Sequence, residues 1–219
     1  MKKYLLLLLA FGLTATGFSQ SDKYMSTMQA KIAVLDTTHS TDALIDLGNS
    51  FERIGDAEKT QWLPYYYAAL AHASAGMMMA MGNGTLGGNA DKTDPEADKA
   101  DAMIQKAEAM SKDNSEIWVV KKMIATLKMM GDPMSRYMTY GPQAAQALET
   151  AKKLNPNNPR VYLLEGQDKF YTPEQYGGSK EEAKELFAEA QKKFDAFKPE
   201  TPIHPTWGLT QLKYLLTQF

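Results

Sequence analysis

Histidine and methionine side chains gather near residue 75, and they are the first candidates for chemistry in this chain. His72 is followed closely by Met77, Met78, Met79 and Met81. Thioether sulfur and imidazole nitrogen are ligands that suit copper, so the cluster could hold a copper ion. Consecutive methionines, however, cannot converge from one helix, and methionine often fills irregular cores. We therefore expect these methionines to serve packing and predict no metal site.

Residues suited to catalysis are scarce. The chain has three histidines and no cysteine, and no His-Glu-x-x-His pair or Gly-x-Ser-x-Gly turn occurs. The glycines between positions 82 and 88 are not followed by the Lys-Ser or Lys-Thr of a phosphate-binding loop. Carboxylates such as those between Lys180 and Glu189 alternate with lysines, which is typical of a solvated helix face. We therefore predict a non-catalytic protein without a cofactor.

Tyrosines and one arginine in three irregular segments are better candidates, and the chemistry they favour is binding. Tyr and Arg side chains dominate binding hot spots. The alternative is that the tyrosines fold back over helix ends and pack locally. The predicted binding residues are Arg136, Tyr137, Tyr140, Tyr171 and Tyr176.

Helices must position these side chains, and a repeated motif indicates which helices they are. The motif is an alanine, a bulky apolar residue four positions later and a small residue three positions after that. These offsets place all three on one helix face, where the small residues let a neighbouring helix approach closely. The motif occurs at Ala43/Leu47/Ser50, Ala100/Ile104/Ala107, Ala144/Leu148/Ala151 and Ala183/Phe187/Ala190. Such recurrence predicts stacked helix pairs.

The predicted fold is an all-α solenoid of about four antiparallel helix pairs and a C-terminal capping helix. Each motif lies in the second helix of its pair, and Asn158-Pro159 and Ser179 are start signals for the fourth pair. The predicted pairs are 23–37 with 41–55, 62–81 with a helix from Asp94-Pro95, 115–130 with 142–154, and a helix from Pro159 with one from Lys180. A helix from Pro205 to Phe219 closes the stack.

These second helices resemble those of the tetratricopeptide repeat family, which carry Ala, an apolar residue, Ala and Pro at the offsets of Ala144, Leu148, Ala151 and Pro156. The resemblance covers about residues 40 to 197 and implies a groove lined by the first helix of each pair. It is looser in those first helices, where Lys122 replaces the usual small residue. The groove residues that the resemblance implies are Tyr66, Trp118, Arg160, Gln167 and Phe170.

The spacing of the motif departs from that family. The four alanines lie 57, 44 and 39 residues apart, whereas the standard repeat is about 34 residues long. We assign the surplus to segments 82–94, 131–141 and 171–179, which join the two helices of a pair and so emerge on the same edge of the stack. Insertions on one edge often bind ligands, so this edge is a predicted binding surface.

The N-terminus predicts export. Lys2 and Lys3 precede an apolar run and then small and polar residues to Gln20, which is typical of a secretory signal peptide over residues 1–20, cleaved near Gly17 to Gln20. Residues 21–219 would form a single domain in the periplasm. Without cysteine the chain cannot be a lipoprotein, and no later segment is long and apolar enough to span a membrane.

Charge and composition leave two hypotheses. Removing Lys2 and Lys3 changes 24 basic against 26 acidic residues to 22 against 26, a net charge of −4. This charge does not favour nucleic acid, so we predict no nucleic-acid partner. The first hypothesis is a protein that binds a protein or peptide in the bacterial envelope. The alternative is a small-molecule-binding accessory protein of a solute transport system, with a closed cavity lined by Tyr137, Tyr140 and Tyr176.

Overall fold

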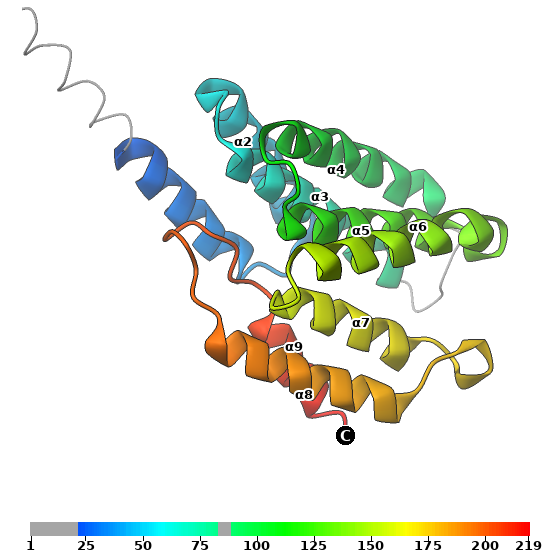
Figure 1. Ribbon diagram of the computed structural model, residues 1–219. Coiled ribbons are helices and arrows are strands. Elements are labelled where there is room, and N and C mark those ends of the chain that lie inside the picture. Colours follow the sequence, from blue (N-terminus) through cyan, green and yellow to red (C-terminus); the bar gives the residue numbers. More distant parts are fainter. Residues whose placement is uncertain (1–21, 83–88) are drawn as a thin grey trace, which may run out of the picture.

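The computed structural model describes residues 22–82 and 89–219 (Figure 1). Within these ranges the chain forms nine α-helices and one short 3-10 helix, and no strand. The N-terminal helix covers residues 22–35. It is followed by α2 (Thr41–Glu58), α3 (Trp62–Met81), α4 (Ala90–Met110), α5 (Ser115–Gly131), α6 (Pro133–Leu154), α7 (Pro159–Tyr171), η1 (Glu174–Tyr176), α8 (Lys180–Ala196) and α9 (Leu209–Leu216).

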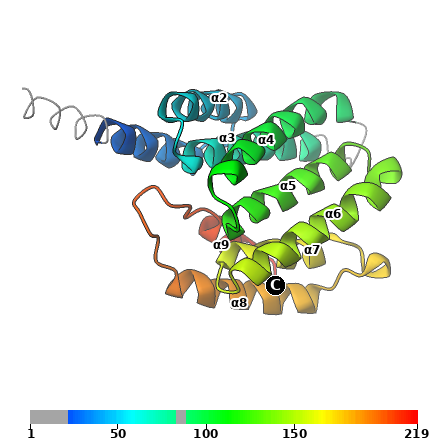
Figure 2. The same ribbon diagram turned by 45° about the horizontal axis from the view of Figure 1, so that its top comes forward.

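Successive helices pack as antiparallel pairs, and the pairs stack on one another (Figures 1 and 2). The prediction of an all-α stack of helix pairs with a closing C-terminal helix is therefore confirmed. None of the helices in the described ranges has the length and apolar character needed to cross a membrane.

The alanine motif packs as predicted. All three residues of Ala100/Ile104/Ala107 and of Ala183/Phe187/Ala190 are fully buried. In the fourth pair α7 meets α8 at Gly166, where an added Cβ would lie only 2.5 Å from the Phe187 ring. A glycine is required there because any side chain would push the two helices apart.

Helix start signals explain where several helices begin. Asn158 accepts a hydrogen bond from the backbone N–H of Arg160, and Ser179 accepts one from that of Glu182. Both side chains satisfy donors that the first helical turn leaves unpaired. The predicted starts of α7 and α8 are confirmed.

Two predicted starts are wrong. Helix α4 begins at Ala90, and α6 begins at Pro133. Asp132 caps the N-terminus of α6 by accepting a hydrogen bond from the backbone N–H of Ser135, and Pro133 fits the first helical position. Pro142 lies inside α6 on its exposed side, so the carbonyl group that it leaves unbonded can reach water. Segment 131–141 is therefore mostly a helical extension and not a loop. Segment 171–179 is a connection that contains η1, as expected. In segment 82–94, residues 90–94 belong to α4 and not to a loop, and residues 83–88 fall outside the described residues.

The C-terminal helix also begins later than predicted, at Leu209, because residues 197–208 cross back over the stack (Figure 1). Tyr67 of α3 donates a hydrogen bond to the carbonyl oxygen of Ile203 at 2.9 Å, and Ile203 is buried in the main core. Arg160 of α7 donates to the carbonyl oxygen of Pro205 at 2.6 Å. This C-terminal segment (residues 197–208) therefore covers the side of the stack formed by α3 and α7.

Candidate functional site

The predicted groove is closed at its centre. Arg160 has no exposed surface, and its Nε donates to Oε2 of Glu116 at 2.8 Å. Tyr66 is also fully buried, donates to the same carboxylate oxygen at 3.1 Å, and accepts a hydrogen bond from Nε1 of Trp207. Tyr66 and Arg160 thus hold the C-terminal segment where the resemblance places a peptide, and a ligand contact by either residue stays a prediction.

The other predicted groove residues do not share one surface. Phe170 packs against Phe219 and Phe187, with ring centroids 5.5 and 6.2 Å apart. Trp118 lines a separate hollow of about 280 Å³ between α4, α5 and α6, with the Lys121 ammonium 4.3 Å from its ring centroid. Gln167 is half-buried, and its amide nitrogen has no hydrogen-bond partner among the described residues.

The predicted edge residues divide into one structural residue and several exposed ones. Arg136 donates two hydrogen bonds to the carboxylate of Asp94, at 2.6 and 2.8 Å, and so ties α6 to α4. These bonds lower the pKa of Asp94. Tyr137, Tyr171 and Tyr176 are 60, 65 and 73% exposed, so they line no closed cavity. Tyr140 is half-buried. These three tyrosines of the edge are thus open to solvent.

The methionine and histidine cluster lies partly in the interior, although Met81 is 60% exposed. Met77 packs against the main core. His72 is buried, and its Nδ1 lies 2.6 Å from Oε2 of Glu96. In the described ranges no three His, Cys, Asp or Glu side chains lie together in a way that could hold a metal ion.

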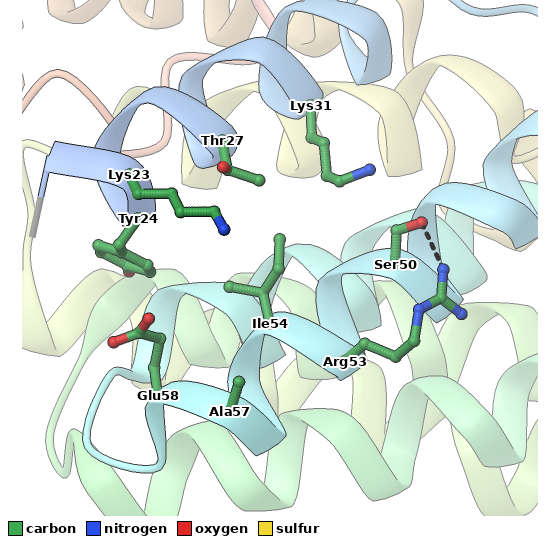
Figure 3. Close-up of a pocket in the computed structure, with 9 residues that line it drawn as sticks. All are labelled: Lys23, Tyr24, Thr27, Lys31, Ser50, Arg53, Ile54, Ala57 and Glu58. Carbon is green, nitrogen blue, oxygen red and sulfur yellow. Dashed lines mark hydrogen bonds between the residues drawn. The ribbon is translucent and has the colours of Figure 1, made fainter. Parts of the chain in front are cut away.

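A hollow that no sequence motif indicated lies between the N-terminal helix and α2 (Figure 3). We call it the N-terminal groove. Its volume is about 550 Å³, within the range of about 300 to 1,000 Å³ that is typical of small-molecule sites. Its lining residues are Lys23, Tyr24, Thr27, Lys31, Ser50, Arg53, Ile54, Ala57 and Glu58. These residues come from two amphipathic helices that run antiparallel, so side chains distant in sequence face each other.

The groove has an apolar middle between two polar ends (Figure 3). Ile54 packs against the main core and presents its side chain to the hollow. Lys31 and Arg53 stand at one end, and Arg53 donates a hydrogen bond to Oγ of Ser50 at 2.9 Å. Lys23 and Glu58 stand at the other end. This arrangement suits a ligand with an apolar body and acidic groups.

Tyr24 lines the groove and also packs against the main core. Its hydroxyl is buried and has no hydrogen-bond partner within the described ranges. Burial, with a smaller contribution from Glu58, raises the pKa of this hydroxyl to about 12. Because the hydroxyl is buried, Tyr24 would meet a ligand in the hollow through its ring.

Comparison with known proteins gives one informative match. No protein-family model and no curated protein sequence matches this chain. Among solved structures, the HusA haemophore from Porphyromonas gingivalis matches with a TM-score of 0.76 and 31% sequence identity, over 89% of this chain and 92% of that chain. A haemophore is a binding protein and not an enzyme, which confirms the prediction of a non-catalytic protein.

Proposed function

Because this chain belongs to the family of the HusA haemophore from Porphyromonas gingivalis, we propose that it binds haem and that the N-terminal groove is the binding site. Haem is a flat, largely apolar ring with two carboxylate groups on one edge. The observation that carries the proposal is the composition of the groove, in which an apolar middle is combined with two cationic side chains at one end, Lys31 and Arg53.

The relationship favours the small-molecule alternative over the binding of a protein or peptide. The buried Tyr66 and Arg160 support the same choice, because the C-terminal segment occupies the place that a peptide would need. A role beside a solute transporter stays a prediction. The same holds for export to the periplasm, since the predicted signal peptide over residues 1–20 lies outside the described residues.

The proposed contacts are to the ring and its carboxylates. None of the nine described lining residues is a histidine, methionine or cysteine. The histidines lie elsewhere, since His72 pairs with Glu96 in the core and His204 packs against Phe197 with a ring-centroid distance of 5.9 Å. His39 is exposed in the turn before α2. The ring would therefore rest on Ile54 and Ala57, with lysine and arginine at its acidic edge.

Filling the groove tests the proposal. Ala57 is exposed on α2 and lines the groove, so Ala57→Trp places a bulky ring in the hollow without changing the core. Ala145→Trp, at an exposed alanine of α6, is the matched control. Haem titrations followed by Soret absorbance should show saturable binding to the wild type and to the control, and at least about tenfold weaker binding to Ala57→Trp, which corresponds to about 1.4 kcal/mol.

Two results would contradict the proposal. Absence of saturable haem binding by the wild type would reject the function. Equal affinity of Ala57→Trp and the wild type would reject the N-terminal groove as the site. Circular dichroism of each variant checks that the helices are intact.

A further inference from the structure

The two ends of the N-terminal groove differ in charge. One end carries Lys31 and Arg53 beside the hydroxyl of Ser50, whereas the other end carries Lys23 and Glu58, which offset each other (Figure 3). The groove therefore has a formal charge of about +2 at one end and about zero at the other. A ligand with acidic groups on one edge would be oriented by this difference.

Arg53 differs from the other arginines of the chain. The sequence contains three, at positions 53, 136 and 160. Arg136 is bonded to Asp94 and Arg160 to Glu116. In the described ranges Arg53 bonds only to the neutral hydroxyl of Ser50, and neither Arg53 nor Lys31 has a carboxylate partner. Arg53 is therefore held in place by Ser50 while its charge remains available.

The chemistry of these two side chains identifies the group that they would bind. A guanidinium presents parallel N–H donors that match the two oxygens of a carboxylate, and hydrogen bonds between charged groups are about twice as strong as neutral ones. At the opposite end Glu58 would repel a carboxylate. An acidic edge is therefore favoured only beside Arg53 and Lys31.

Resting on the proposed function, we infer that Arg53 and Lys31 determine the specificity of the groove. They select flat apolar ligands that carry carboxylates on one edge, and they bind that edge at the end of the groove where Ser50 lies. The apolar edge of the ligand then points toward Tyr24. The class of ligand is the tetrapyrrole dicarboxylate, and its carboxylates contribute to affinity independently of the metal at its centre.

Paired ligands and paired variants test this inference. Protoporphyrin IX and its dimethyl ester have the same ring, but only the first carries carboxylates. The wild type should bind the diacid at least about tenfold more tightly than the ester, which corresponds to about 1.4 kcal/mol. Arg53→Glu should remove most of this preference by weakening the diacid alone, and Arg53→Gln should have a smaller effect. Lys23→Glu is the matched charge reversal at the other end and should change diacid affinity less than about threefold.

The outcomes separate the inference from the proposed function. If the wild type binds diacid and ester equally, or if Lys23→Glu and Arg53→Glu weaken the diacid equally, the inference is wrong while haem binding stands. If the wild type binds neither porphyrin nor haem, both are wrong. Arg53 and Lys23 are exposed, so their variants should fold, and thermal unfolding followed by circular dichroism verifies this.

Discussion

Replacing Arg160 with methionine removes the cation at the centre of the buried network that joins α3, α5, α7 and the C-terminal segment. Methionine keeps a long apolar stem but leaves the Glu116 carboxylate without its cation and the carbonyl oxygen of Pro205 without its donor. Glu116 retains hydrogen bonds from Asn158 at 2.8 Å and from Tyr66 at 3.1 Å. The carboxylate is therefore not wholly unsatisfied, but its charge is no longer neutralised.

The expected loss of stability follows from these contacts. Removing one partner of a buried ion pair costs about 3 to 5 kcal/mol. Because Glu116 keeps two neutral donors, we expect about 3 kcal/mol for Arg160→Met. Adding Glu116→Gln removes the uncompensated charge, so the double variant should be more stable than Arg160→Met alone. If the two residues acted independently, adding Glu116→Gln would lower the stability further.

Urea unfolding followed by circular dichroism measures these differences. With a urea dependence of about 2 kcal/mol per molar, a loss of about 3 kcal/mol lowers the midpoint by about 1.5 M. A loss below about 1 kcal/mol for Arg160→Met would refute the structural role of this arginine. A double variant less stable than Arg160→Met would refute the argument from the uncompensated charge.

Three further predictions test other parts of the structure. Arg136→Gln should raise the pKa of Asp94 in an NMR titration, because the hydrogen bonds from Arg136 lower that pKa. The ion pair therefore stabilises the fold at pH values above the ordinary carboxyl range, and this stabilisation is lost as the pH falls through the lowered pKa of Asp94. An unchanged pKa of Asp94 in the variant would contradict this prediction. Ala190→Leu, at a fully buried position, should cost about 1 to 3 kcal/mol by overpacking in urea unfolding, whereas Ala188→Leu on the exposed face should cost less than about 0.5 kcal/mol. Tyr137→Ser should leave haem affinity within about twofold of the wild type in a Soret titration. A tenfold loss of affinity, or about 1.4 kcal/mol, would indicate that haem binds at the predicted edge and not in the N-terminal groove.

The helix pairs could be predicted because the residues that pack each helix against its neighbour lie close together in the sequence. Ala183, Phe187 and Ala190 are close along one helix, and their spacing alone places them on one face. The start of α6 lies well before the predicted start at residue 142. Asp132 and Pro133 in fact provide the cap and the first residue. Either proline is compatible with a start, and only the surrounding fold decides between them.

The proposed binding surface is harder to predict from the sequence because it depends on contacts between distant residues. Trp207 reaches Tyr66 across 141 positions of sequence, and nothing near Tyr66 indicates that its hydroxyl is already bonded. The N-terminal groove depends on the separation of two helices, which no local pattern encodes. Lys31 and Arg53 lie on different helices at one end of that hollow, so only the packing of the two helices brings them together.

Mapping the bound ligand by NMR tests the central claim most directly. Gallium protoporphyrin IX, a diamagnetic analogue of haem, would be titrated into the isotope-labelled protein. We predict that the largest amide shifts fall in residues 23–31 and 50–58, which line the N-terminal groove. The account would be contradicted if the shifts gathered instead in residues 134–140 and 171–176, at the exposed edge.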